Sequence, residues 1–175
     1  AFNYSGYARV TRELLLPLAE LGVPVALDTH DEDERFVSDM NRNPERVARW
    51  NRMLQRRHSR GVQVCFHPAV TMDGRRPGMD AYAGYTMFET DRLPRGWAEA
   101  ADRMDRVFTP SHFSRGAFLR AGLNPDRVRR LPHGIDWRAF DAACAATRAA
   151  GATPRRPDAG TVFLSVFEWS HRKGP

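Results

Sequence analysis

The sequence predicts an α/β domain built on a Rossmann-like parallel sheet with flanking helices. Short apolar runs alternate with helical patterns of about ten residues, which is the order expected of βαβ units. Polar residues follow three of these runs, at Glu89, Ser111 and His133. Ligands bind at the carboxyl ends of the strands in such sheets. We therefore expect these three residues to lie at the working edge of the domain.

Five segments are predicted to form helices: residues 7–22, 44–57, 97–104, 112–122 and 136–150. The first has Val10 and several leucines at helical spacing, and Pro17 inside it should kink the helix. Pro44 opens the second, in the first turn, where proline is well tolerated. Ser111 stands directly before the fourth and Gly122 ends it, so we expect Ser111 to cap that helix.

Six short apolar runs are predicted to form strands: residues 23–27, 61–66, 85–88, 106–109, 128–131 and 161–167. The acidic stretch 29–43 and the stretch 69–82, which contains glycine and proline, are predicted loops. Residues 151–160 hold two prolines and two glycines, which is typical of a linker. The predicted organisation is therefore a Rossmann-like domain over residues 1–150, this linker, and the first strand and loop of a second domain over residues 161–175.

The chain is basic, with 27 lysines and arginines against 21 acidic residues and a net charge of +6. Lys173 is the only lysine, and the arginines are interspersed with acidic residues. A nucleic-acid footprint requires clustering, so a general replacement of lysine by arginine is favoured and no nucleic-acid partner is expected. Cys65 and Cys144 lack metal-ligand spacing, which predicts no metal and fits a reducing cytoplasm. No apolar run approaches the roughly 20 residues that span a bilayer.

Four polar features could carry chemistry. Ser5-Gly6 precedes the first helix, where its N–H groups could bind an anion or simply form a cap. Lys173 follows a buried run and stands between an arginine and a glycine, which suits a phosphate or diphosphate. Glu89 could accept hydrogen bonds from substrate hydroxyl groups or pair with a neighbouring arginine. His133 lies in a Pro-His-Gly turn, and its ligand role is left open because proline and glycine chiefly shape the turn.

Five segments follow one another along the chain: SGYARVTREL, GYTMFETDRLP, VFTPSHFSRGAFLRAGL, PHGID and FLSVFEWSHRKG. In order and spacing they resemble glycosyltransferase family 4, the retaining enzymes of the GT-B fold. The resemblance implies two Rossmann-like domains that face a cleft, the N-terminal one holding the acceptor and the C-terminal one the nucleotide sugar. The chain would then be a piece of a longer protein, truncated at both ends. It would lack the first strand and stop early in the donor-binding domain.

The resemblance also implies roles for single residues. Ser5 and Gly6 match the glycine-rich loop near the donor phosphates, and Lys173 matches the lysine that binds the donor diphosphate. A basic residue that the family commonly has a few positions before this lysine has no counterpart here. Glu89 falls where the family places an acceptor-side polar residue near the reacting sugar, often a histidine, and is the expected catalytic residue. The acceptor side or cleft would hold the remaining candidates: Tyr7, Ser111 and His133.

The implied activity is transfer of a sugar from a nucleotide-sugar donor to an acceptor with retention. Charge develops on the leaving phosphate, and fixed cations and helix N-termini can stabilise it without a metal or other cofactor. The family's paired-glutamate motif would lie beyond Pro175, so we expect the chain alone to be inactive. The acceptor (carbohydrate, lipid or protein) is left open, as is peripheral membrane association of the parent protein, whose expected location is cytoplasmic. The alternative is a non-enzymatic, arginine-rich module that binds nucleic acid or an anionic surface.

Overall fold

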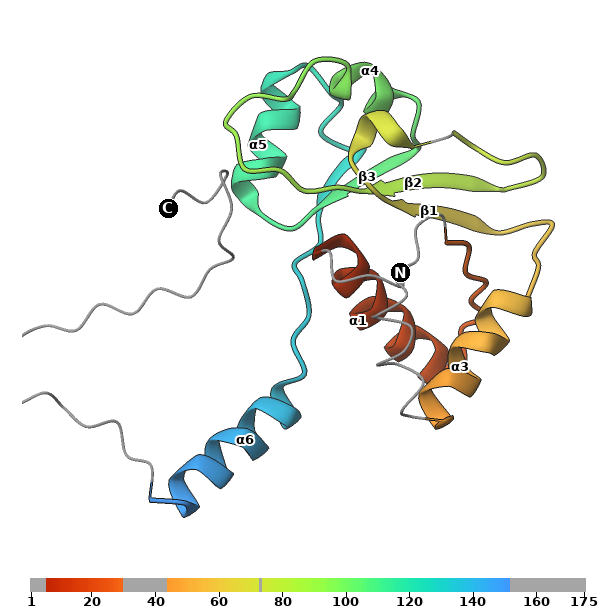
Figure 1. Cartoon of the computed structure of the whole chain (residues 1–175). Helices are drawn as coiled ribbons and strands as arrows, with labels where there is room; N and C mark the ends of the chain where they lie inside the picture. Colours follow the sequence, from red (N-terminus) through yellow and green to blue (C-terminus); the bar gives the residue numbers. More distant parts are fainter. Residues whose placement is uncertain (1–5, 30–43, 73, 152–175) are drawn as a thin grey trace, which may run out of the picture. The chain divides into compact units, whose positions relative to one another are not determined.

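The computed structural model describes residues 6–29, 44–72 and 74–151. These residues fall into two compact units that divide between Ile135 and Asp136. The first unit holds a sheet and most of the helices, and the second holds one helix (Figure 1). The division lies before the predicted end of the first domain at residue 150. The predicted linker and the predicted strand over residues 161–167 lie outside the described part, apart from Gly151.

The sheet has four strands: β1 (Val62–Phe66), β2 (Ala81–Tyr85), β3 (Arg106–Thr109) and β4 (Val128–Arg130). They lie in the order β1-β2-β3-β4, and every neighbouring pair is parallel. The fold is therefore α/β and Rossmann-like, as predicted. The register pairs Phe66 with Tyr85, Tyr85 with Phe108, and Thr109 with Arg130, so the carboxyl ends of all four strands meet at one edge.

The helical elements are α1 (Gly6–Glu20), α3 (Pro44–Gln55), the 3-10 turn η1 (Ala69–Thr71), α4 (Trp97–Asp102), α5 (His112–Arg120) and α6 (Trp137–Ala149). Figure 1 shows α4 and α5 on one side of the sheet and α1 and α3 on the other. Because the strand order advances in one direction, right-handed connections place α4 and α5 on the same face. The first helix runs through Pro17 and ends at Glu20.

Two apolar clusters stabilise the first unit. The larger lies between the sheet and helices α4 and α5, and its most deeply buried members include Met104, Val107 and Phe118. The smaller cluster gathers Leu27, Trp50 and Met53, with side chains of α1 packed against it. Burial of one such large apolar side chain contributes about 1.5–3 kcal/mol. The sheet and the pair of helices α1 and α3 therefore each have an apolar core of their own.

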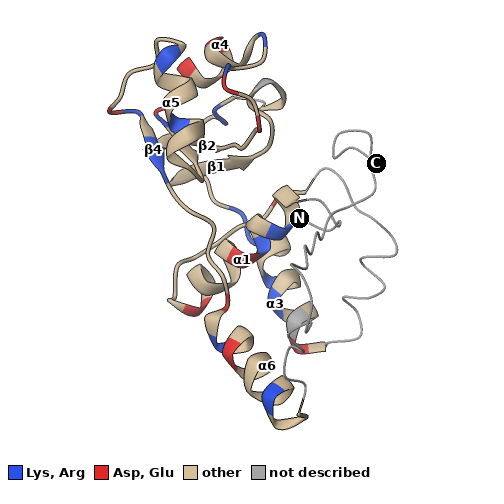
Figure 2. Ribbon diagram, turned by 90° about the vertical axis from the view of Figure 1, so that its left-hand side faces the viewer, with Lys and Arg blue, Asp and Glu red and all other residues tan. Residues whose placement is uncertain are grey.

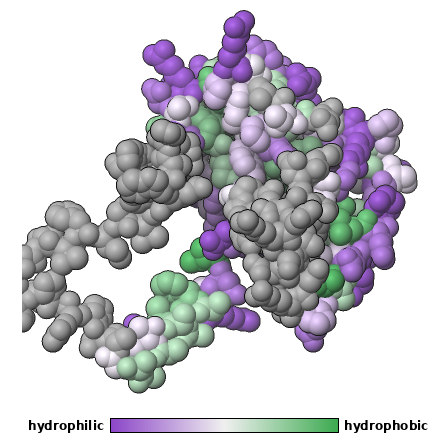
Figure 3. All heavy atoms as spheres, in the orientation of Figure 1, coloured by the Kyte–Doolittle hydropathy of each residue, from purple (hydrophilic) through white to green (hydrophobic). Residues whose placement is uncertain are grey.

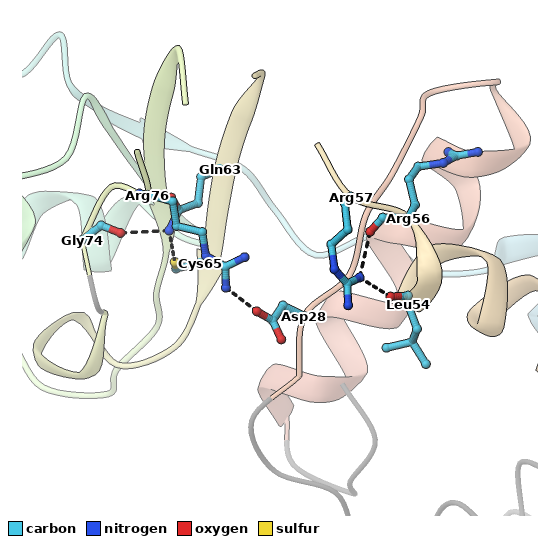
Figure 4. A network of polar contacts seen from close by, with 8 residues as sticks. All are labelled: Asp28, Leu54, Arg56, Arg57, Gln63, Cys65, Gly74 and Arg76. Atoms are coloured by element: carbon cyan, nitrogen blue, oxygen red, sulfur yellow. Dashed lines mark hydrogen bonds and ion pairs between the residues drawn. The ribbon is translucent and has the colours of Figure 1, made fainter. Parts of the chain in front are cut away.

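The predicted strand over residues 23–27 is wrong, because these residues pair with no strand in the described part of the chain. The Leu27 N–H donates instead to the Met53 carbonyl at 2.9 Å, and the Leu27 side chain packs against Trp50 and Met53. Asp28 pairs with Arg76, as Figure 4 shows. Helix α3 and this ion pair thus provide the contacts for residues 23–28 that a neighbouring strand would otherwise provide.

The second strand lies four residues earlier than predicted, over Ala81–Tyr85 rather than 85–88. The prediction placed the first residues of this strand in the loop over residues 69–82 because that stretch contains Gly74, Pro77 and Gly78. Tertiary packing explains the difference, since a Cβ atom on Gly84 would lie 2.5 Å from the Met104 sulfur and 2.8 Å from the Met72 sulfur. Small residues are thus required where the sheet meets these methionines.

A network of polar contacts holds the turn before β2 against β1 (Figure 4). The Gln63 side chain donates from Nε2 to the Gly74 carbonyl at 2.9 Å and accepts the Arg76 N–H at 2.7 Å. Asp105 also contacts β2, because its carboxylate accepts the Tyr82 N–H at 2.7 Å. The same carboxylate pairs with Arg75 in the turn before β2. Polar side chains therefore fix the connection that the sequence predicts as a flexible loop.

Helix α6 is the element of the second unit that lies within the described residues. Asp136 caps it, since its carboxylate accepts the Ala139 N–H at 3.0 Å. The helix buries none of its residues, and Trp137 and Phe140 are 60% and 64% exposed. Figure 3 shows this hydrophobic surface along the helix. Across the described residues, no helix combines the length and apolar character needed to cross a membrane.

Candidate functional site

The candidate site lies at the carboxyl edge of the parallel sheet. His67 follows β1, Thr86 follows β2 and His133 stands three residues beyond β4. Since Phe66 and Tyr85 are register partners, His67 and Thr86 leave the sheet side by side. Backbone pairing continues for one residue past β2, where the Thr86 N–H donates to the Phe108 carbonyl at 3.0 Å. This edge is where α/β sheets bind ligands.

Tyr7, in the first turn of α1, reaches this edge from outside the sheet. Its hydroxyl accepts the Met87 N–H at 3.0 Å and donates to the Met87 carbonyl at 2.7 Å. The same hydroxyl lies 3.3 Å from the Thr86 Oγ1. The Tyr7 ring stacks on the His67 ring, with centroids 6.4 Å apart and planes 15° from parallel. One side chain thus joins the start of α1 to the ends of two strands.

Glu89 lies two residues beyond Met87, on the exposed bend that follows β2. The prediction that Glu89 ends a strand is wrong, because β2 ends at Tyr85. The carboxylate nevertheless lies in the electrostatic environment of Tyr7. Burial raises the pKa of Tyr7, and the negative charge of Glu89 adds to that rise. The structure therefore brings together two of the predicted site residues, Tyr7 and Glu89.

His133 reaches the same edge through a neighbouring aromatic residue. Its ring lies 5.8 Å from that of Tyr85, tilted by 33°. The Tyr85 hydroxyl donates to the Leu131 carbonyl at 2.8 Å and so anchors the segment that leaves β4. Burial raises the pKa of Tyr85 to about 12, with a smaller contribution from Tyr7. His133 itself is exposed, which leaves its imidazole accessible to a ligand.

Ser111 caps α5, as predicted. Its Oγ accepts the Ser114 N–H at 3.0 Å and lies 3.0 Å from the Ser114 Oγ. The hydroxyl is thus used within the first turn of the helix. The predicted place of Ser111 in the cleft remains a prediction, and its demonstrated contacts are structural.

The predicted donor-phosphate residues are described only in part. Gly6 is the first residue of α1 and is exposed, and a Cβ atom there would meet nothing within 4 Å. Backbone N–H groups at this end of the helix lack partners within the helix and favour an anion. Ser5 and Lys173 lie outside the described residues, so their predicted roles remain predictions.

Sequence reasoning missed His67 and Thr86. His67 follows a predicted strand directly, which is the signal that singled out Glu89, so the same rule would have found it. Thr86 is 1% exposed and was hidden because the strand was placed four residues too late. Its hydroxyl sits within reach of Tyr7, which makes it part of the same polar cluster.

The charged surface explains the many arginines of the chain. Exposed arginines pair with acidic residues: Arg9 with Glu13, Arg49 with Glu20, Arg60 with Asp80, Arg127 with Asp102 and Arg129 with Asp126. In Figure 2 the positions of basic and acidic residues are interspersed along the ribbon of the described elements. Each such exposed pair contributes about 0–1 kcal/mol, so they matter more for the distribution of charge than for stability.

Comparisons with protein families, with characterised proteins and with solved structures find no match to this chain. Within residues 6–29, 44–72 and 74–151, no three histidine, cysteine, aspartate or glutamate side chains gather in a way that could hold a metal ion. The geometry therefore defines a class of site, the carboxyl edge of an α/β sheet. A tyrosine, two histidines and a carboxylate stand around it.

Proposed function

We propose that this chain is the acceptor-side half of a retaining glycosyltransferase of family 4. Such an enzyme transfers a sugar from a nucleotide-sugar donor to an acceptor hydroxyl group. The observation that carries the proposal is the meeting of the α1 N-terminus with the Glu89 bend, joined by Tyr7 at the carboxyl edge of the sheet. The five sequence segments that resemble the family include both of these elements.

The chemistry of sugar transfer needs opposite charges at two places. The departing nucleoside diphosphate gains negative charge, which the positive end of the α1 dipole, near Gly6, can stabilise. Lys173 would add a fixed cation on the donor side. The reacting sugar gains positive character, and the carboxylate of Glu89 can stabilise it or hold the acceptor hydroxyl. The two elements that Tyr7 joins thus carry the two charge types that the reaction requires.

The alternative of a nucleic-acid module requires a clustered basic face and aromatic stacking residues. The described arginines are instead distributed among acidic partners. This arrangement favours the enzyme over the binding module.

The proposal is tested on the full-length protein in which we expect this chain to lie. Release of nucleoside diphosphate is followed with a panel of UDP-, GDP- and ADP-sugars. We expect release from one donor, loss of release in Lys173→Ala, and a decrease of about 100-fold in Glu89→Gln, the size of one positioned catalytic group. Glu99→Gln, an exposed carboxylate on α4, is the matched control and should keep wild-type turnover.

Two results would contradict the proposal. One is the absence of release from every donor, together with salt-sensitive binding to nucleic acid, which would favour the binding module. The other is equal turnover in Glu89→Gln and Glu99→Gln, which would remove Glu89 from the site.

A further inference from the structure

We propose that Tyr7 is a positioning residue that holds Glu89 in place relative to the N-terminus of α1. This inference rests on the proposed function, because it matters only if both elements act on the same substrate. Tyr7 would then act through Glu89 and through the backbone of Met87, without itself touching the reacting atoms.

We call the contact of the Tyr7 hydroxyl with the Met87 backbone the clamp. The backbone hydrogen bonds show why it is needed at this point. Sheet pairing after β2 ends with Thr86, whose N–H donates to Phe108. Met87 is the next residue, and both its N–H and its carbonyl bond to the hydroxyl of Tyr7, at 3.0 and 2.7 Å. The Tyr7 hydroxyl therefore bonds to the backbone of the first residue beyond the sheet pairing. A two-point contact to one peptide unit restricts both the position and the orientation of that unit.

The other end of the clamp is also fixed. The Tyr7 ring stacks on His67 beyond β1, and the Tyr7 carbonyl accepts the Thr11 hydroxyl at 2.8 Å within α1. Ala8 and Val10, which follow Tyr7 in the helix, are buried. The side chain is thus held by β1 on one side and by its own helix on the other, so it can transmit a defined position to Met87.

The chain between the clamp and the carboxylate is short. Only Phe88 separates Met87 from Glu89, so their Cα atoms lie at most about 7 Å apart. Phe88, which lies between them, packs against Trp97 and Phe118, and the Asp91 carbonyl accepts Arg120 at 2.7 Å. Tyr7 therefore fixes the start of a bend whose later residues are held by α4 and α5. A fixed Met87 confines Glu89 to the region of the α1 N-terminus. This matters because the rate of a catalysed reaction falls steeply when a catalytic group is misplaced by a small distance. The phenol is protonated at neutral pH, as donation to the Met87 carbonyl requires, and burial raises its pKa further above the ordinary value of 10.0.

A purely structural role for Tyr7 is the competing explanation, and Tyr82 provides the matched control. Tyr82 is 1% exposed, lies in β2 and accepts the Gly74 N–H through its hydroxyl at 3.2 Å. It packs in the cluster beneath α4, on the face opposite that of Tyr85. Tyr82→Phe therefore removes a tyrosine hydroxyl from the same sheet without touching the Glu89 bend. Tyr7→Phe keeps the ring that stacks on His67.

The experiment measures nucleoside diphosphate release by the full-length protein carrying Tyr7→Phe or Tyr82→Phe, each alone and combined with Glu89→Gln. We expect Tyr7→Phe to lower kcat about 10-fold with the donor KM within about 2-fold, and Tyr82→Phe to leave both unchanged. In the Glu89→Gln background, Tyr7→Phe should change kcat by less than about 2-fold, because coupled residues are not additive.

The possible failures are distinguishable. Wild-type kcat in Tyr7→Phe, or a full 10-fold loss that persists in the Glu89→Gln background, overturns the positioning role and leaves the proposed function intact. Hydrogen exchange at the Met87 amide tests the clamp without any donor. Exchange should be faster in Tyr7→Phe than in Tyr82→Phe, and equal exchange overturns the clamp. If the unmodified protein releases no nucleoside diphosphate, the proposed function itself fails, and the positioning role fails with it.

Discussion

Single residues at the carboxyl edge differ in how the fold uses their polar groups. The hydroxyls of Tyr85 and Ser111 bond to the protein itself, to the Leu131 carbonyl and the Ser114 N–H. His133 and Glu89 have exposed side chains on the same part of the molecule. Because a ligand can reach exposed side chains, we expect His133 and Glu89 to make the direct contacts and the tyrosines to support them.

Ser111 allows the structural role of one candidate to be separated from a binding role. Ser111→Ala removes the acceptor for the Ser114 N–H, so we expect the free energy of unfolding to fall by about 1 kcal/mol. Ser111→Asp keeps an acceptor at the cap and should restore most of that loss. Urea unfolding of the three proteins provides the measurement. A stability of Ser111→Ala equal to that of wild type would show that the cap contributes nothing, and would return Ser111 to the candidates for binding.

At the scale of elements, sequence prediction succeeded where local chemistry decides. The serine before α5 caps its helix as predicted, and β3 falls over the predicted residues 106–109. It failed where packing between distant residues decides. Strand β2 includes Gly84, which lies too close to Met72 and Met104 for a side chain, and residues 23–27 pack against α3 instead of entering the sheet.

The same reasoning explains how much of the site was predictable. Glu89, His133 and Ser111 were found because each follows an apolar run, a signal that lies within a few residues. The contact of Tyr7 with Met87 joins residues 80 positions apart in the chain, and no local sequence pattern predicts it. Sequence therefore located the edge of the sheet, and the family resemblance made Tyr7 a candidate, while the contacts of Tyr7 with Met87 emerged only from the folded chain.

Gly84 should be the least replaceable residue of β2. In Gly84→Ala, the new methyl group would meet the sulfurs of Met104 and Met72 at 2.5 and 2.8 Å, inside a buried cluster. Overpacking of this kind costs about 1–3 kcal/mol, and flexible methionines place the expected loss toward the lower end. Gly134→Ala is the control, since a Cβ atom there meets nothing within 4 Å. Equal thermal midpoints for the two variants would contradict the packing argument.

For the first unit as a whole, two polar contacts help to join the part that contains α1 and α3 to the sheet and the turn before β2. Tyr7 bonds to the end of β2, and Asp28 pairs with Arg76 before the same strand. The two apolar clusters lie on either side of these links. Protonation of the groups in these contacts should therefore contribute to the stability of the unit.

Alkaline pH tests this dependence through the tyrosines. Burial raises the pKa of Tyr7, Tyr82 and Tyr85 above the ordinary value of 10.0, in Tyr85 to about 12. A group whose pKa is raised on folding stabilises the native state fully below its unfolded pKa, and this contribution is lost as the pH rises through the folded pKa. We therefore expect the free energy of unfolding to fall continuously between about pH 10 and about pH 12.

Urea unfolding across this range, combined with phenolate absorbance, measures the effect. In the native protein these three tyrosines should ionise later than in urea, where all should ionise near the ordinary value. Tyr85→Phe should flatten the alkaline decline, because it removes the residue with the largest resolved rise in pKa. Native phenolate formation that coincides with that of the urea-unfolded chain would show that the aromatic groups are hydrated. The edge that Tyr7 and Tyr85 support would then be too open to fix Glu89 and His133.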